Sequence, residues 1–240
     1  MVIIASVLSF TAGFFLANTL NRNQLTANPS GGEALKSTQS ANNPASAELS
    51  LTSEEIQKKI AEADKNPGNF TFQKNLGLAL YRYAAMKQDA NLLPDAVRIM
   101  ERALAIEPAD RDLQIRIGNA YFDKGYLNKN NDGFVKSREF YGKALAKMPT
   151  DTDVRTDLAL TYFLFDPPDL AAAAAELQKG LEAQPKHERA LQFLTQTYIK
   201  QNEPVKAAAT LARLKQAHPS SPSIAELSTM LSNAGLGTPQ

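Results

Sequence analysis

Residues 128–139, NKNNDGFVKSRE, come closer than any other stretch of the chain to a metal-binding motif. Asn128, Asn130 and Asp132 place side-chain oxygens at alternate positions, and Glu139 closes the segment. In a calcium-binding loop, such oxygens surround the ion, a glycine allows a tight turn, and the last glutamate binds with both of its oxygens. The spacing raises the hypothesis of a calcium-responsive sensor that uses residues 128–139.

The charge of this segment counts against a calcium site. Its first ligand position holds Asn128 instead of an aspartate, so Asp132 and Glu139 are its only carboxylates, and a calcium ion favours more negative charge. The Asn-Asp-Gly sequence is also typical of a turn. We therefore expect residues 127–134 to form a long polar loop between two helices, without a metal ligand.

Other reactive side chains are scarce. The chain has no cysteine and only two histidines, His187 and His218. It contains neither a G-x-x-x-x-G-K-[ST] phosphate-binding loop nor a G-x-G-x-x-G dinucleotide motif. Lys and Arg number 26 against 25 Asp and Glu, whereas nucleic-acid-binding proteins usually concentrate positive charge. We predict a protein that is not an enzyme, holds no cofactor and binds no nucleic acid.

The beginning of the chain predicts a membrane anchor followed by a linker. Residues 1–21 contain no charged side chain, and residues 2–20 would span about 28 Å as a helix, close to the hydrocarbon thickness of a bilayer. Residues 22–50 are rich in Asn, Ser, Ala, Gly and Pro, as in a flexible linker. The prediction is a single-pass membrane protein whose orientation stays open, and a cleaved signal peptide is the alternative.

Small residues recur at every fourth position of the predicted anchor, at Ala5, Ser9, Gly13 and Ala17. A stripe of this kind lets two membrane helices approach closely. A homodimer through the anchor helix is therefore one hypothesis for the oligomeric state. A self-assembling structural protein is the corresponding hypothesis for function.

Prolines divide the rest of the chain into repeating segments. Pro67, Pro108, Pro149, Pro185 and Pro219 are separated by 41, 41, 36 and 34 residues. Between them, apolar residues recur every three to four positions, the pattern of helices with one buried face. Proline ends every second helix because its ring cannot continue one. An internal period of this size predicts an α-solenoid.

The repeating segments resemble the tetratricopeptide repeat (TPR). The resemblance is clearest in IRIGNAYFDKG, residues 115–125, and REFYGKALAKMP, residues 138–149. Gly118 and Ala144 are small residues of the kind found where the two helices of a TPR unit cross. The resemblance implies an all-α, TPR-type solenoid over residues 51–240. The expected repeats are about 70–110, 111–151, 152–187 and 188–221, with helical caps at 53–65 and 222–235.

In proteins of this family, the first helices of successive units line a groove that holds a segment of a partner protein. The resemblance therefore implies a membrane-tethered interaction scaffold that binds a peptide or helix of a partner. A clamp for a C-terminal carboxylate is not expected, because Leu78 stands where such a clamp has an asparagine. The groove residues implied by the resemblance are Lys74, Leu78, Tyr81, Asn119, Phe122, Asp123, Leu160, Phe163 and Gln196.

Overall fold

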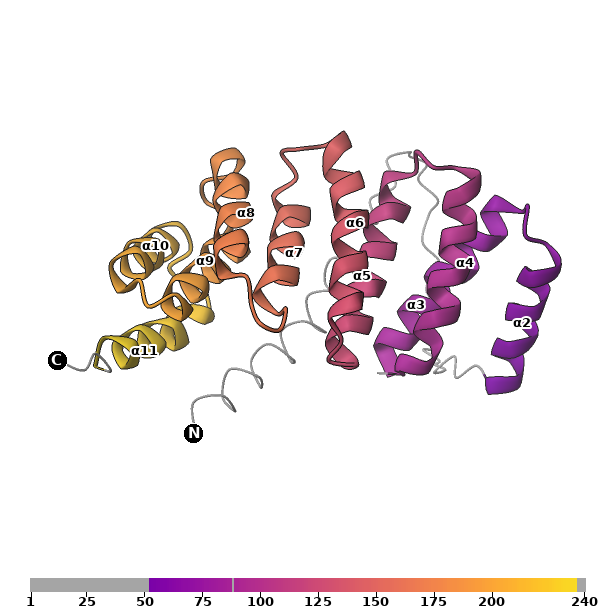
Figure 1. The fold of residues 1–240 in the computed structure, drawn as a ribbon, viewed down its shortest axis with the longest axis horizontal. Helices are drawn as coiled ribbons and strands as arrows, with labels where there is room; N and C mark the ends of the chain where they lie inside the picture. Colours follow the sequence, from indigo (N-terminus) through magenta and orange to yellow (C-terminus); the bar gives the residue numbers. More distant parts are fainter. Residues whose placement is uncertain (1–51, 88, 237–240) are drawn as a thin grey trace, which may run out of the picture. The chain divides into compact units, whose positions relative to one another are not determined.

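The computed structural model describes residues 52–87 and 89–236, and all regular structure in these ranges is helical (Figure 1). The chain divides into two compact parts, residues 1–55 and 56–240. The all-α prediction is confirmed for the described residues. In chain order the helices are α2 (Ser53–Lys65), α3 (Phe70–Lys87), the short 3-10 helix η1 (Ala90–Leu92), α4 (Leu93–Ile106), α5 (Arg111–Leu127), α6 (Asn131–Lys147), α7 (Thr152–Phe163), α8 (Leu170–Ala183), α9 (Glu188–Lys200), α10 (Pro204–Ala217) and α11 (Ser223–Leu236).

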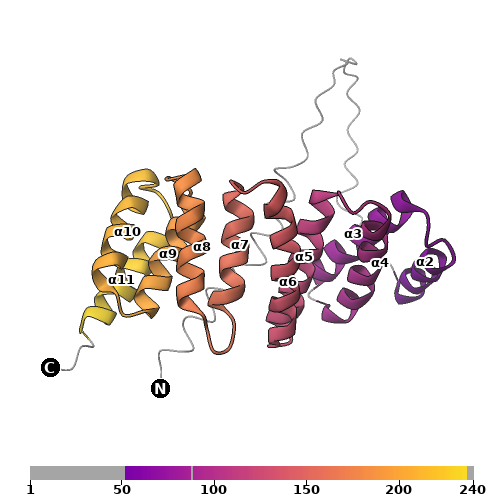
Figure 2. The same ribbon diagram turned by 45° about the horizontal axis from the view of Figure 1, so that its top comes forward.

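Consecutive helices of the second part form four antiparallel pairs, which we number as units 1 to 4: α3 with α4, α5 with α6, α7 with α8, and α9 with α10 (Figures 1 and 2). Each unit therefore has a first and a second helix. The units stack in chain order, and neighbouring units contact each other mainly through the second helix of one unit and the first helix of the next. At the two ends of the stack, Ile60 and Ala63 of α2 pack against unit 1, while α11 packs against unit 4.

The first helix of every unit begins in the same way. A polar residue two positions after the preceding proline accepts a hydrogen bond from the backbone N–H three residues further on. This residue satisfies one of the unpaired N–H groups that every helix start leaves. The proline thus ends one helix and the polar residue starts the next, which explains their regular spacing. The four capping residues are Asn69, Asp110, Asp151 and His187.

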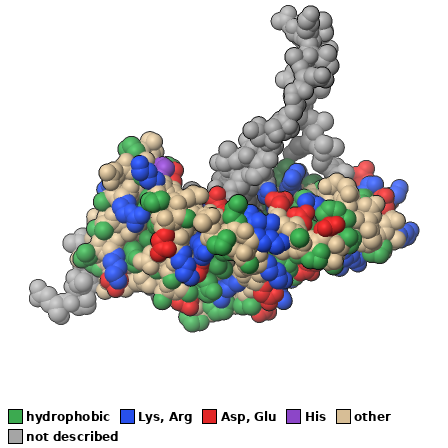
Figure 3. Space-filling model, turned by 90° about the horizontal axis from the view of Figure 1, so that it is seen from above, with side chains coloured by type: hydrophobic (Ala, Val, Ile, Leu, Met, Phe, Trp, Pro, Cys, Tyr) green, Lys and Arg blue, Asp and Glu red, His purple; other side chains and the backbone are tan. Residues whose placement is uncertain are grey.

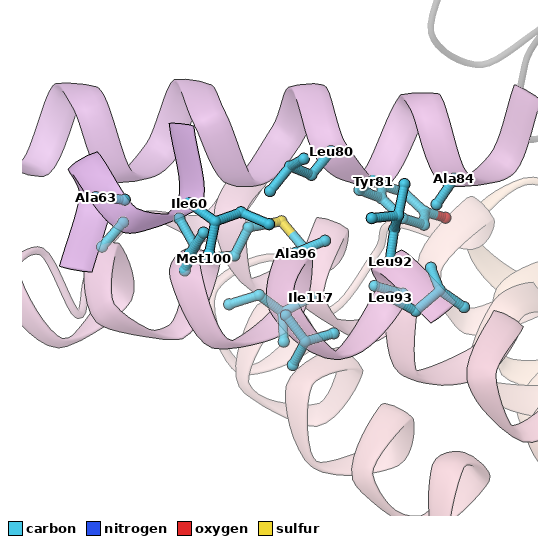
Figure 4. Packing of buried hydrophobic residues seen from close by; sticks show 14 of the residues in the cluster. Ile60, Ala63, Leu80, Tyr81, Ala84, Leu92, Leu93, Ala96, Met100 and Ile117 are labelled. Atoms are coloured by element: carbon cyan, nitrogen blue, oxygen red, sulfur yellow. The ribbon is translucent and has the colours of Figure 1, made fainter. Parts of the chain in front are cut away.

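Within each of the first two units, a glycine of the first helix faces a large side chain of the second. Gly77 faces Met100, and Gly118 faces the ring of Tyr141, where an added Cβ atom would lie 2.7 Å from a ring carbon. Both large side chains are buried. Figure 4 shows Met100 in one cluster with Leu80. The small residues let the two helices of each of these units approach closely, and the core of unit 1 continues into α2 and α5.

Residues 127–134 do not form the predicted long loop. Helix α5 continues to Leu127 and α6 begins at Asn131, so the turn comprises residues 128–130 alone. The side chain of Asn130 caps α6 by accepting a hydrogen bond from the backbone N–H of Asp132. The prediction was wrong because asparagine and aspartate favour the first turn of a helix as well as a loop.

Two glycines bring the ends of α5 and α6 together at this turn. Both Gly125 and Gly133 are buried. A Cβ atom added to Gly133 would lie 2.4 Å from the backbone nitrogen of Gly125. No side chain fits at that distance, so this approach of two backbones requires glycine.

The last helix, α11, takes the place of the first helix of a fifth unit, but it has no second helix beside it in the described residues. Counted from the preceding prolines, Ser228 and Ser232 of α11 stand where α9 has Leu194 and Tyr198, which are both buried in unit 4. The two serine hydroxyls donate to backbone carbonyls four residues earlier. The side chains that α11 exposes include Thr229, Ser232 and Asn233, so its solvent-facing side is polar, as at the end of a solenoid.

The predicted localisation, a single-pass membrane protein, is contradicted. In residues 52–87 and 89–236, no helix is both long enough and apolar enough to cross a bilayer. The predicted anchor in residues 1–21, the linker in residues 22–50 and the homodimer contact along the anchor all lie outside the described residues.

Candidate partner-binding face

The first helices of the four units form one layer of the solenoid. We call the side of this layer that faces away from the second helices the first-helix face. Figure 3 shows charged and hydrophobic side chains interspersed over one side of the molecule, without a large field of one sign. Side chains link each helix of the first-helix layer to the next and make the face continuous across the units. Between α3 and α5, the Tyr81 hydroxyl donates a hydrogen bond of 2.7 Å to Asp123 Oδ2. Between α5 and α7, Arg111 forms an ion pair of 2.6 Å with Asp151, the cap of α7. Between α7 and α9, the rings of Phe163 and Phe193 meet edge to face with their centres 6.5 Å apart.

Four of the five apolar residues predicted for the groove are almost fully covered. Tyr81, Phe122, Leu160 and Phe163 expose between 1% and 4% of their surface, whereas Leu78 is half-buried. The four covered side chains fill the space between neighbouring helices. A partner would therefore reach Leu78 but little of the other four.

Three of the four predicted polar residues are also engaged or covered. Asn119 is 9% exposed and accepts a hydrogen bond of 2.8 Å from the Tyr141 hydroxyl. Gln196 is 5% exposed. Lys74 forms an ion pair of 2.5 Å with Asp110, the cap of α5. That pairing compensates the charge of Lys74 within the protein.

The fourth predicted polar residue, Asp123, has the most unusual environment of the set. It is half-buried, and the Tyr81 hydroxyl donates to its carboxylate. Burial raises the pKa of Asp123 to about 7; the charge of Asp157 adds to this effect, and the bond from Tyr81 opposes it. Burial, followed by the charge of Asp123, also raises the pKa of Tyr81. Asp123 therefore changes charge near neutral pH.

The structure adds charged residues of α7 and α9 that the predicted set lacks. Arg189 of α9 lies 2.6 Å from Asp157 of α7, and both side chains are largely buried. When the units are aligned on their prolines, Arg189 lies one helical turn before the position equivalent to Asp157. This spacing of opposite charges in neighbouring units is the feature of the sequence that indicates the ion pair. The Lys200 ammonium lies 4.1 Å from the centre of the Phe163 ring, and burial lowers the pKa of Lys200.

The residues of the calcium-like segment have structural partners. The side chain of Asn131 donates to the carbonyl of Asp166 at 2.7 Å and accepts from its N–H at 3.1 Å, so it holds the turn between α7 and α8. Glu139 pairs with Lys136 at 3.2 Å. Among the described residues, no three His, Cys, Asp or Glu side chains are grouped so that they could hold a metal ion.

Sequence comparison identifies the repeats. Residues 164–231 match the family model described as tetratricopeptide repeat. This part of the chain contains tetratricopeptide repeats. This match covers α8, unit 4 and most of α11, and the prediction of a TPR-type fold is confirmed. No curated protein matches the chain in sequence.

Solved TPR structures superpose on more than two thirds of the chain. PilW, a widely conserved type IV pilus biogenesis factor, has a TM-score of 0.57 at 17% identity, over 77% of this chain and 80% of its own. MamA from Desulfovibrio magneticus RS-1 has a TM-score of 0.54 at 17% identity, over 70% of this chain and 86% of its own. TTC0263, a thermophilic TPR protein of Thermus thermophilus, has a TM-score of 0.52 at 16% identity, over 76% of this chain and 89% of its own. The shared property is the fold, which is typical of protein-interaction scaffolds.

Proposed function

We propose that this chain is a non-catalytic scaffold that binds a segment of a partner protein on the first-helix face. The main support is the set of polar side chains that the first helices carry, of which Asp123 is half-buried and Asn119 and Gln196 are nearly covered. Asn119, Asp123 and Gln196 belong to first helices, where packing alone would favour apolar residues. Polar groups that a core does not need are typical of recognition surfaces.

The nine predicted residues divide into three roles under this proposal. Leu78 and Asp123 are open enough for direct contact with a partner. Lys74, Asn119 and Gln196 set the arrangement of polar groups around Leu78 and Asp123. The remaining residues hold the first helices at the spacing that the face requires, and these are Tyr81, Phe122, Leu160 and Phe163.

Photo-crosslinking tests which face of the solenoid binds a partner. A photoreactive amino acid replaces Arg82, Leu164 or Lys200, which occupy equivalent positions in units 1, 3 and 4. Lys143 of α6 and Glu182 of α8, which are exposed on second helices, serve as matched control positions. The full-length variants are irradiated in an extract of the cells that produce the protein.

We expect the same protein to be crosslinked from Arg82, Leu164 and Lys200 and not from the two control positions. Circular dichroism establishes that each variant is folded. Crosslinks confined to Lys143 and Glu182, or equal from both sets, would show that the first-helix face is not the binding surface.

A further inference from the structure

The aspartates of the two central first helices differ in how their charge is compensated. Helices α5 and α7 carry four aspartates. Two of them lie beside an arginine, and Asp153 is exposed to solvent beside His187. Asp123 is the exception, since its contact in the described residues is the neutral hydroxyl of Tyr81. The three pairs are Asp112 with Arg116 at 3.4 Å, Asp153 with His187 at 3.3 Å, and Asp157 with Arg189 at 2.6 Å.

The surroundings of Asp123 make it energetically unfavourable for its carboxylate to have no cation beside it. The carboxylate is half-buried, so water screens its charge only in part. The electrostatic effect of Asp157 on Asp123 is unfavourable, since both groups carry negative charge. A half-buried carboxylate next to a second one favours a nearby cation over solvent.

Asp123 is also placed where a partner could supply that cation. It lies on α5, between α3, which provides Tyr81, and α7, which provides Asp157. The residues at the equivalent position of the other units are Arg82, Leu164 and Lys200. Unit 2 is therefore the one place in this row with a negative charge, flanked by units that would repel a basic group or attract it less.

We propose that the first-helix face recognises a partner segment carrying a lysine or arginine, whose side chain pairs with Asp123 between α3 and α7. This inference rests on the function proposed above and adds the chemistry of the partner. The cation would compensate the one half-buried aspartate of the central first helices that has no basic side chain beside it in the described residues. Tyr81 then positions the carboxylate, because its hydroxyl fixes one oxygen and leaves the other for the incoming side chain.

Peptide selection tests this specificity directly. The full-length chain at pH 8 selects from a phage library of random peptides of about 12 residues, a length that fills an extended groove. Calorimetry then measures the dissociation constants of the selected peptides. The Asp123→Asn variant keeps the shape of the side chain and an acceptor for Tyr81. The matched control, Asp112→Asn, makes the same change on the same helix at an exposed aspartate.

We expect the selected peptides to share a Lys or Arg at one position. Asp123→Asn weakens their binding about tenfold or more, as removal of one member of a partly buried charge pair does. Replacement of the shared basic residue by methionine causes a similar loss, and the two changes together cause little further loss. Asp112→Asn changes the affinity less than about twofold, as expected for an exposed charge.

Two other outcomes overturn the inference, and they differ in what they leave standing. Peptides that crosslink to the Arg82 or Leu164 position but bind Asp123→Asn as tightly as the unmodified chain refute the pairing with Asp123 and leave the proposed function intact. A selection that yields no peptide, or only peptides that crosslink to the Lys143 or Glu182 position, refutes the proposed function as well.

Discussion

In unit 2 and in unit 4, the first helix is connected to the second by a turn of the same kind, but the helices of the two units differ in length. Each turn has three residues, 128–130 in unit 2 and 201–203 in unit 4. The middle residue of each, Lys129 or Asn202, has a left-handed backbone with φ of 49° or 58°. Yet α5 and α6 have 17 residues each, whereas α9 has 13 and α10 has 14.

The seven residues by which the 41-residue period exceeds 34 are therefore all helical. Aligned on the prolines, residues 124–127 lengthen α5 and residues 131–133 lengthen α6. The turn keeps its geometry and is moved outward by about one helical turn, since each turn of a helix takes 3.6 residues. A repeat can thus grow by extending both helices, provided that the added ends can pack, and Gly125 and Gly133 provide that packing.

The added helical segment of unit 2 also acts on unit 3. Asn131 holds the backbone of Asp166 through two hydrogen bonds. Further along α6, the Arg138 guanidinium lies 3.9 Å from the centre of the Tyr162 ring and 4.5 Å from that of Phe165. Unit 4 shows no such contact to α11 from its turn among the described hydrogen bonds. The extension therefore provides contacts between units that the shorter repeat lacks.

The substitution expected to disturb the extended helix ends of unit 2 most strongly is Gly133→Ala. The new methyl carbon would meet the α5 backbone at 2.4 Å, so we expect the free energy of unfolding to fall by about 3 kcal/mol or more. Urea denaturation measures it. Gly142→Ala is the matched control in the same helix, because a Cβ atom there has open space, and we expect it to be neutral or to stabilise by up to about 1 kcal/mol. Equal effects would refute the close packing of the two helix ends.

Arg138→Ala should remove the contact of unit 2 with the start of the α7–α8 turn. The guanidinium donates to the Thr161 hydroxyl and carbonyl at 2.9 and 3.0 Å besides its ring contacts, and we expect a loss of about 2 kcal/mol. Hydrogen exchange should rise in residues 164–169. Lys136→Ala, on the same helix with only an exposed ion pair, should cost less than about 0.5 kcal/mol. Unchanged exchange after Arg138→Ala would contradict this prediction.

The pH dependence of stability distinguishes position 123 of unit 2 from its equivalent, Lys200, in unit 4. The folded-state pKa of Asp123, about 7, is above the unfolded value of about 3.9. Its carboxylate therefore destabilises the fold above pH 7, and this cost disappears as the pH falls from about 7 to 4. We expect Asp123→Asn to be more stable than the unmodified chain by about 1–2 kcal/mol at pH 8, after allowance for solvent screening, and equally stable near pH 4. Parallel profiles in urea titrations from pH 4 to 8 would disprove it.

Asn131→Ala should have the smallest effect. Both of its hydrogen bonds to Asp166 are exposed, so water replaces them, and we expect a loss of about 1 kcal/mol or less. The change should speed hydrogen exchange at the Asp166 amide. Asn128→Ala, three residues earlier in an exposed position, should leave that amide unchanged. A slow Asp166 amide in the Asn131 variant would mean that other contacts hold the turn.

The sequence predicts the helix pairs well because prolines, capping residues and helical periodicity are local signals. Within the predicted loop 127–134, residues 131–134 are helical instead, since Asn, Asp and Gly favour both turns and helix starts, and only the packing of Gly125 on Gly133 decides between them. For an apolar residue of the first helices such as Phe122, the sequence alone does not distinguish contact with a partner from packing against a neighbouring helix. The Asp157–Arg189 pair depends on how adjacent units are rotated, which a single sequence does not specify.

Helix α11 determines how this protein can change in length during evolution. A unit added after α11 would meet the exposed polar side chains of Thr229, Ser232 and Asn233, where the junction of units 3 and 4 has the Phe163–Phe193 contact, so it would bury less apolar surface. A duplicated internal unit would instead meet matching neighbours on both sides. Duplication of an interior unit is therefore a less costly way to lengthen the array than addition of a unit after α11.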